Sequence, residues 1–237
     1  MIITALLTGK KISTFKNKNE IKLHDEFIFN YPAKQAKKVK EINFFYTSSD
    51  SEIILNQTKK IGFKSINRPR NLARKNSKHI DVLKHALSIF EKKNQYPDIL
   101  VVLLANDTIV KSKWIRDCIK ILKKNKDITS VVPVQNINDH HPERAKQIKN
   151  NVLKSFINKK KISSNRQDLT KCFFLCHNFW VIRTKEILKN NGQLPWSFMG
   201  KRVRSYEIKS SIDIHSAMDV EIAKILIKNE KLNKKFF

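Results

Sequence analysis

The chain has 237 residues, 41% of them hydrophobic, and a formal net charge of +27. This length suits one large domain with a buried core, and no apolar run approaches the roughly 18 residues that a membrane-spanning helix needs. The apolar start is short and has no basic residues before it, so we expect a cytoplasmic protein with no membrane partner.

The strong positive charge raises the question of nucleic-acid binding. Nucleic-acid interfaces favour arginine, whereas lysine is far commoner here and is spread along the whole chain. The high Lys, Asn and Ile content is typical of a protein encoded by an AT-rich genome. We therefore expect the charge to attract small anionic substrates, such as a nucleoside triphosphate or an acidic sugar, and do not expect nucleic acid as a partner.

The cysteines carry no metal-binding pattern. Cys172 and Cys176 are near each other in the chain, Cys118 stands alone, and no CxxC pair occurs. A zinc site is therefore not expected, and all three side chains are predicted to be free thiols.

Apolar strands and amphipathic helices alternate over the first part of the chain. Predicted strands cover residues 2–7, 42–47, 63–66, 99–104 and 128–134. Predicted helices lie within residues 25–40, 51–61, 78–93 and 113–124. The third of these helices carries an apolar stripe that includes Leu83, Leu87 and Phe90. This alternation predicts an α/β fold with a doubly wound, mostly parallel, Rossmann-like sheet.

The pattern changes in the second half of the chain. Residues 135–170 are polar, rich in Asn, His and Lys, and only weakly periodic, which predicts a protruding insertion. Two further elements are predicted, an aromatic strand at 172–182 and a closing helix at 213–228. We therefore expect one domain over residues 1–237, with 135–170 as a small inserted segment.

The first predicted strand ends in a basic loop with hydroxyl and amide side chains. This loop holds Lys10, Ser13, Lys18 and Asn19. In α/β folds phosphate groups bind in such loops, because backbone N–H groups and cationic side chains meet there. Neither glycine-rich phosphate motif, GxGxxG or GxxxxGK[ST], is present. The loop predicts a nucleotide-using enzyme, and a lysine-rich loop after an edge strand is the alternative.

Two other segments place polar side chains near predicted strand ends. Asn106 follows the strand at 99–104, while Asp213 and His215 lie just before the closing helix. Residues two apart in an extended segment face the same side, so Asp213 and His215 are expected to act together. A carboxylate in this place can hold Mg²⁺ beside phosphate oxygens. The alternatives are a helix cap for Asp213 and a solvated loop histidine for His215.

Several motifs follow one another in an order typical of one enzyme family. They are Lys18-Asn19 at the end of the basic loop, YTSSDSEI, RPRNLARKNSKHIDVLKHAL, LVVLLANDT, VVPV, NRQDLTKCFF and IDIHSAMDVEIAKILI. In this order and spacing, the chain resembles the acylneuraminate cytidylyltransferases, the CMP-sialic acid synthetase-like enzymes, over residues 3–227. The resemblance implies a nucleotidyltransferase version of the Rossmann-like fold.

The chain departs from the family pattern at several places and is therefore identified as a divergent member. Lys10-Lys11-Ile12 stand where the family has an arginine and glycines. Residues 105–108 replace a Gln-Pro-Thr-Ser loop, and His215 replaces a second aspartate. Lysine supplies the charge of arginine but not its forked pair of hydrogen bonds.

The resemblance implies transfer of CMP from CTP to a 2-keto sugar acid of the acylneuraminate, legionaminate or pseudaminate type. The implied catalytic residues are Lys10, Lys18 and Asp213. The implied ligands of Mg²⁺ are Asp213 and His215. The implied nucleotide-binding residues are Ser13, Asn19, Arg68, Ser77 and Asn106. Arginine suits a sugar carboxylate, and the implied sugar-binding residues are Arg166, Gln167, Arg144 and His177.

The resemblance also implies a homodimer in which residues 135–170 lie against the partner's active site.

The residues alone leave two other classes of protein open. A nucleotide-sugar glycosyltransferase would carry an Asp-x-Asp pair after a central strand, where this chain has Asn106-Asp107. A nucleic-acid-binding or non-catalytic protein that keeps the fold would fit the +27 charge and the altered first loop.

Overall fold

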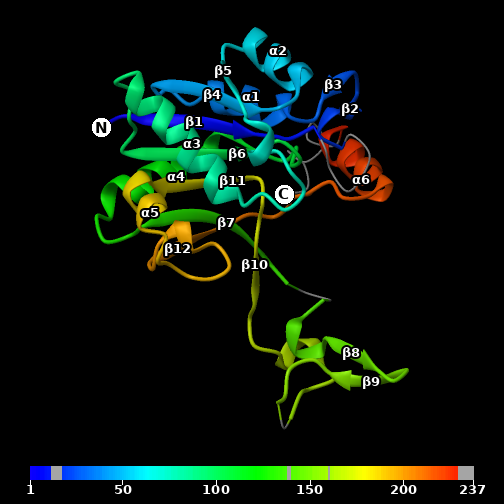
Figure 1. The fold of residues 1–237 in the computed structure, drawn as a ribbon. Helices are drawn as coiled ribbons and strands as arrows, with labels where there is room; N and C mark the ends of the chain where they lie inside the picture. The colour runs from blue at the N-terminus through cyan, green and yellow to red at the C-terminus, as the bar shows by residue number, and fades with distance from the viewer. Residues whose placement is uncertain (12–17, 138–139, 160, 229–237) are drawn as a thin grey trace.

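The computed structural model describes residues 1–11, 18–137, 140–159 and 161–228, and its centre is one mixed sheet (Figure 1). The strand order is β10-β7-β11-β6-β1-β4-β5, and β12 also pairs with β7. The strands are β1 (Ile3–Thr8), β4 (Phe44–Ser49), β5 (Lys64–Asn67), β6 (Ile99–Leu104), β7 (Ser130–Asn136), β10 (Phe173–Leu175), β11 (Phe179–Arg183) and β12 (Val203–Glu207). Only β10 and β11 run antiparallel to their neighbours within the described part of this sheet. The predicted α/β fold with a mostly parallel sheet is confirmed.

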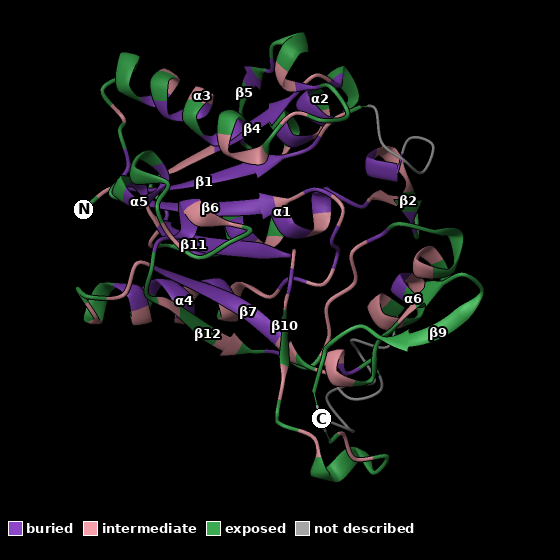
Figure 2. Cartoon of the chain, turned by 60° about the horizontal axis from the view of Figure 1, so that its bottom comes forward, coloured by how far each residue is buried: buried purple, intermediate pink, exposed green. Residues whose placement is uncertain are grey.

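Helices cover both faces of the sheet, because apolar side chains point alternately to the two faces of the central strand β6. The helices are α1 (Asn30–Lys37), α2 (Glu52–Lys60), α3 (His79–Lys92), α4 (Ser112–Lys124), α5 (Thr184–Lys189) and α6 (Ala217–Lys228). Val101 and Leu103 join a core with α1, α2 and α4, whereas Val102 joins a core with α3 and α5. The central strands of the sheet are buried (Figure 2). Among the helices in the described ranges, none is long and apolar enough to cross a membrane.

The strands β1, β4 and β6 end side by side. Thr8, the last residue of β1, pairs with Ser48 of β4 and with Leu104 of β6. After β1, the described chain continues with the 3-10 helix η1 (Lys18–Glu20) and the small hairpin of β2 (Lys22–Leu23) and β3 (Glu26–Phe27), which precede α1. Because the three strands are parallel, the loops that follow them leave the sheet at the same edge, where ligands bind in open α/β sheets.

The segment before the closing helix differs from the prediction. The helix α6 begins at Ala217 rather than at residue 213, because Ser216 and Asp219 cap it reciprocally. The N–H of Ser216 donates to Asp219 Oδ2 over 2.8 Å, and the N–H of Asp219 donates to Ser216 Oγ over 3.3 Å. Asp213 lies upstream and forms a β-bridge with Asp107. Asp213 is therefore not the helix cap.

The aromatic strand predicted at 172–182 is divided into β10 and β11. Both segments pair with β7, but Cys176 and its neighbours lie between them without strand geometry. The indole N–H of Trp180 donates to the carbonyl oxygen of Cys176 over 3.0 Å, which holds this irregular turn in place. The short helix α5 and the edge strand β12 are not predicted from the sequence.

The described residues between β7 and β10 form an arm that projects from the sheet (Figure 1). The arm holds the hairpin of β8 (Lys146–Lys149) and β9 (Val152–Ser155), and the 3-10 helices η3 (Pro142–Arg144) and η4 (Arg166–Asp168). Ile148 and Leu153 form a cross-strand pair on this hairpin, and both side chains are exposed, at 73% and 68%. The elements of the arm, from η3 to η4, fall within residues 135–170, the segment that the sequence predicts as an insertion.

Candidate active site

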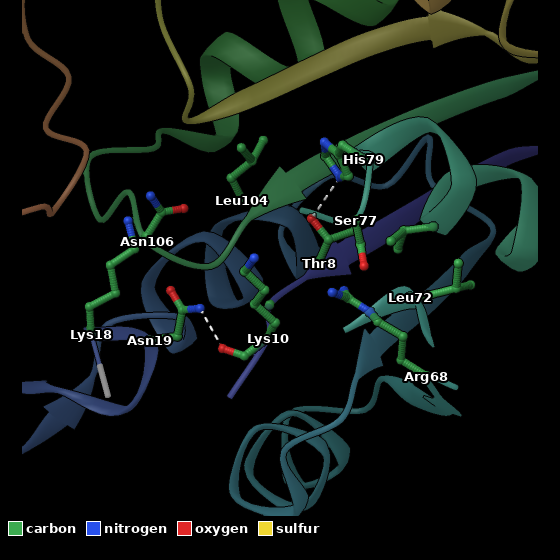
Figure 3. Close-up of a pocket in the computed structure, with 12 residues that line it drawn as sticks. Thr8, Lys10, Lys18, Asn19, Arg68, Leu72, Ser77, His79, Leu104 and Asn106 are labelled. Carbon is green, nitrogen blue, oxygen red and sulfur yellow. Dashed lines mark hydrogen bonds between the residues drawn. The ribbon is translucent and has the colours of Figure 1, made fainter. Parts of the chain in front are cut away.

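A pocket opens where β1, β4 and β6 end (Figure 3). Its lining residues are Thr8, Gly9, Lys10, Lys18, Asn19, Arg68, Leu72, Ser77, His79, Val82, Leu104 and Asn106. The list includes both lysines predicted as catalytic and every described residue predicted for nucleotide binding. They come from the loop after β1, the segment around the 3-10 helix η2 (Arg70–Leu72) and the loop after β6. Predicted Ser13 lies outside the described residues.

Gly9 lets the end of β1 lie close to the loop after β6. A Cβ atom on Gly9 would lie 2.8 Å from the Cβ of Ala105 and 3.1 Å from Cδ1 of Ile54. The variant Gly9→Ala is therefore expected to force the two strand ends apart and to lower the free energy of unfolding by about 1–3 kcal/mol. Urea denaturation measures this loss. The double variant Gly9→Ala, Ala105→Gly should recover part of it, and unchanged stability in the single variant would contradict the close approach.

The Arg68 guanidinium is buried against the end of β4. Its Nη2 donates to the carbonyl oxygen of Ser48 over 2.7 Å, and its Nε donates to Ser48 Oγ over 3.3 Å. Burial lowers the pKa of Arg68 to about 10, and the Asp50 carboxylate opposes the shift. The side chain is therefore charged at neutral pH, and it is a fixed source of hydrogen-bond donors for a nucleotide.

Lys10 and Lys18 bring positive charge to the pocket. The ammonium group of Lys10 donates to the carbonyl oxygen of Lys75 over 3.4 Å, and the Asn19 amide donates to the carbonyl oxygen of Lys10 over 2.7 Å (Figure 3). Burial lowers the pKa of Lys18, while the nearby Asp213 carboxylate opposes this shift. Two cations in one cleft attract a polyanion such as a triphosphate.

Asp213 links the pocket lining to two histidines. Its Oδ1 accepts a hydrogen bond from the Asn106 side-chain amide and lies 4.0 Å from the Nζ of Lys18. Its Oδ2 lies 2.9 Å from Nε2 of His215 and 3.8 Å from Nδ1 of His177. The structure thus brings together, from four separate segments, residues that the sequence predicts for catalysis, nucleotide binding, metal binding and sugar binding.

Asp107 is a buried carboxyl group that the sequence analysis did not place in the site. Its Oδ1 accepts a hydrogen bond from the N–H of Ile109 over 2.8 Å, and the Ser211 hydroxyl donates to Oδ2. Burial raises the pKa of Asp107 to about 8. Its backbone bridge to Asp213 fixes the loop after β6 to the segment before α6. Asp107 therefore positions Asp213. The sequence feature that could have indicated this role is the place of Asp107 directly after Asn106 at a strand end.

The groups around Asp213 suit a magnesium ion together with a triphosphate. Within the residues that the structure describes, no group of three or more His, Cys, Asp or Glu side chains is placed to hold a metal. Mg²⁺ is commonly held by one or two carboxylates together with substrate phosphates and water, so the Asp213 carboxylate fits this ion. His215 offers a nitrogen atom, which suits Mg²⁺ less well than oxygen does.

The predicted sugar-binding residues lie in two places. His177 lies beside Asp213 and packs against Trp196, with their ring centroids 5.2 Å apart. Arg144 ends η3, and Arg166 and Gln167 begin η4 on the arm. These three arm residues do not line the pocket of their own chain.

His79 lines the pocket at the start of α3. Its Nε2 lies 3.1 Å from Oγ1 of Thr8, and its ring packs against Trp180 with the centroids 5.5 Å apart. Burial lowers the pKa of His79 to about 3, with smaller contributions from the charges of Arg68 and His177. The imidazole is therefore neutral at physiological pH.

Acidification is expected to destabilise the fold through His79. Between the native pKa of about 3 and the unfolded value of about 6.5, the unfolded chain binds a proton at His79 that the native chain does not. The free energy of unfolding therefore falls as the pH drops through this range, by up to about 1.4 kcal/mol per pH unit. Urea denaturation across this pH range should show that the free energy of unfolding of His79→Asn depends less steeply on pH than that of the wild type. Identical slopes for the two proteins would contradict a neutral imidazole in the native state.

A mostly parallel sheet with a cationic pocket at the carboxyl ends of its strands is typical of nucleotide-binding α/β proteins. The sequence model of a family described as Cytidylyltransferase matches residues 13–221. The chain therefore belongs to the cytidylyltransferase family, and the predicted enzyme class is confirmed.

Several solved structures share this fold. The structure of CMP:2-keto-3-deoxy-manno-octonic acid synthetase with CTP has a TM-score of 0.69 at 12% identity, covering 97% of this chain and 100% of that chain. The 4-diphosphocytidyl-2C-methyl-D-erythritol synthase of Anaerococcus prevotii has a TM-score of 0.63 at 14% identity, with 96% of each chain covered. Another 4-diphosphocytidyl-2C-methyl-D-erythritol synthase has a TM-score of 0.66 at 7% identity, covering 96% of this chain and 100% of that chain. No curated protein sequence matches this chain at a significant level.

Proposed function

We propose that this cytidylyltransferase transfers CMP from CTP to a sialic-acid-type 2-keto sugar acid, of the acylneuraminate, legionaminate or pseudaminate type, for surface-glycan synthesis. The products are the CMP-sugar and pyrophosphate. The observation that carries the proposal is the meeting of Lys10 and Lys18 with the Asp213 carboxylate at one pocket. Such a pocket supplies cations for a triphosphate and a carboxylate close to where its phosphates would lie.

In this reaction the anomeric hydroxyl of the sugar attacks the α-phosphorus of CTP, and pyrophosphate leaves. The protein supplies alignment and charge neutralisation rather than covalent chemistry. Lys10 and Lys18 offset the negative charge that develops on the leaving pyrophosphate. Bound Mg²⁺, which Asp213 would hold, neutralises phosphate charge and lowers the pKa of the attacking hydroxyl. His215, with its Nε2 2.9 Å from Oδ2, fixes the orientation of the Asp213 carboxylate.

The fold likeness favours a second candidate acceptor. The structure with a TM-score of 0.69 is named as a synthetase of the CMP conjugate of 2-keto-3-deoxy-manno-octonic acid. That acceptor is also a 2-keto sugar acid, so the same nucleotide pocket and the same carboxylate recognition would serve it. The two acceptors differ in the length and substituents of the sugar, and the shape of the sugar pocket would discriminate between them.

We further propose that the enzyme is a homodimer held by the arm. A two-stranded hairpin is at best marginally stable in water by itself. The β8–β9 hairpin nevertheless leaves Ile148 and Leu153 exposed and pairs only with itself among the described strands. A second copy that covers these side chains would bring Arg166 of one chain to the pocket of the other.

The variant Arg166→Ala is expected to raise the KM for the sugar acid more than the KM for CTP. Arginine binds a carboxylate through two parallel hydrogen bonds, so their loss should weaken sugar binding by roughly tenfold or more. Steady-state kinetics in each substrate measures the difference. An unchanged KM for the sugar would remove Arg166 from the site.

Mixing two defective variants tests whether the sites are shared between subunits. In a mixed dimer of Arg166→Ala and Asp213→Asn chains, one site would combine an intact pocket with an intact arm. The mixture should therefore be more active than either variant alone. Activity equal to the average of the two separate variants would contradict a shared site.

The acceptor is identified by pyrophosphate release from CTP and Mg²⁺ against a panel of sugar acids. The panel holds acylneuraminate, legionaminate, pseudaminate and 2-keto-3-deoxy-manno-octonate, with 2C-methyl-D-erythritol 4-phosphate as an acceptor without a carboxylate. Release with a nine-carbon sugar acid is the expected result. Release with the octonate selects the second candidate, and release only with the methylerythritol phosphate would overturn both. No release and no CTP binding would support a non-catalytic protein that keeps the fold.

A further inference from the structure

The pocket has two chemically different ends (Figure 3). Lys18 and Asn106 lie at one end, next to Asp213, while Arg68, Leu72 and His79 lie at the other. A triphosphate needs cations, whereas a nucleobase needs apolar surface for its faces and a few polar groups for its edge. The triphosphate therefore fits the end with Lys18, and the base fits the end with Leu72 and His79.

The hydrogen bonds of Thr8 indicate which nitrogen of His79 carries the proton. Oγ1 of Thr8 lies 3.1 Å from Nε2 of His79, and the same hydroxyl donates to the carbonyl oxygen of Leu103 over 3.4 Å. Since a hydroxyl has one proton, its oxygen accepts a hydrogen bond from Nε2–H of His79 when that proton is donated to Leu103. In the neutral imidazole this leaves Nδ1 as an acceptor, and no group in the described ranges hydrogen-bonds Nδ1.

We propose that His79 is a specificity-determining residue that selects cytosine over uracil, with Nδ1 accepting a hydrogen bond from the amino group of the base. This inference rests on the proposed function, because it takes a cytidine nucleotide as the ligand. Cytosine carries an amino donor where uracil carries a carbonyl acceptor. An acceptor at Nδ1 therefore pairs with cytosine and leaves two acceptors facing each other when uracil is bound.

The surroundings of His79 maintain this arrangement. Its ring packs against both Trp180 and Phe198, with centroid distances of 5.5 and 6.2 Å. Burial keeps the imidazole neutral, so Nδ1 is not converted into a donor by protonation. Arg68 can donate to the base carbonyl that cytosine and uracil share, so it adds affinity without discrimination. The choice between the two bases then depends on His79.

Asparagine and glutamine variants distinguish the roles of the two ring nitrogens of His79. Asparagine can present its amide oxygen near the position of Nδ1, whereas glutamine reaches the position of Nε2 and keeps only the contact with Thr8. Calorimetric titration with CTP and with UTP, without any acceptor sugar, gives the ratio of the two dissociation constants. We expect His79→Asn to keep the preference for CTP and His79→Gln to reduce it by roughly tenfold. The matched control His85→Gln, on the same helix but outside the pocket lining, should keep the wild-type ratio.

The outcomes separate this inference from the proposed function. If wild type prefers CTP and His79→Gln keeps that preference in full, the role of His79 is overturned and the proposed function stands. If wild type does not bind CTP, both are overturned. Nitrogen-15 spectra of the histidine side chains give a reading that does not depend on a variant's folding. A proton on Nε2 of His79 is expected, and a proton on Nδ1 would overturn the assignment.

Discussion

Replacing Asp213 with Asn is expected to lower the rate of CTP-dependent pyrophosphate release by about a hundredfold or more, because the site loses its negative charge. The substitution keeps the size of the side chain and an oxygen atom that can accept from Asn106. It removes the charge that faces Lys18 and His215. The fold should survive, because Asp219 and not Asp213 caps α6. Single-turnover assays and thermal unfolding measure the two effects separately.

A matched control removes one negative charge from the same region without touching the pocket. Glu221 lies on the exposed side of α6, where its carboxylate accepts from Lys224 over 2.7 Å. The variant Glu221→Gln should therefore retain wild-type activity. Full activity in Asp213→Asn, or an equal loss in both variants, would contradict the placement of Asp213 in the site.

Replacing Lys18 with Met is expected to lower kcat/KM for CTP by about a hundredfold, because one of the cations facing the triphosphate is lost. Lys18 is buried, and burial lowers the pKa of its ammonium, so this charge is already partly desolvated before the nucleotide binds. Interactions with phosphate oxygens are stronger in such a place than in bulk water. Methionine fills the volume of the lysine stem, so the loss measures the charge rather than the packing.

The control for Lys18 is Lys11, an exposed lysine of the same loop that does not line the pocket. The variant Lys11→Met removes the same charge and should change kcat/KM for CTP little at physiological ionic strength, because exposed charges are screened by salt. A comparable loss in both variants would indicate general attraction by the basic surface instead of a specific contact from Lys18.

The part of the site that lies at strand ends could be predicted from the sequence. The apolar runs of β1 and β6 are visible in the sequence, and each is followed by a polar residue, Lys10 or Asn106. Because the two strands are parallel neighbours, these polar residues lie at the same edge of the sheet. The helix at 51–61 could be predicted for the same kind of local reason, since Ser51 caps it by accepting a hydrogen bond from the N–H of Ile54.

The missed parts depend on contacts between distant segments or on elements with weak local signals. The helix α5 has only six residues, too few to show a helical period, and β12 is a partly exposed edge strand whose sequence, VRSYE, lacks a regular alternation of apolar and polar residues. The pairing of His79 with Thr8 joins residues 71 positions apart. Asp107 and Ser211 are farther apart still, and their contact depends on how the last segment crosses the sheet edge.

The measurement that tests this account most directly is a crystal structure of the protein with CTP and Mg²⁺. We expect the cytosine ring between Leu72 and His79, and the triphosphate along Lys10 and Lys18 toward Asp213. This arrangement would confirm the pocket at the ends of β1, β4 and β6 as the nucleotide site. A reversed nucleotide, with its base against Lys18, or CTP bound outside this pocket would contradict the account.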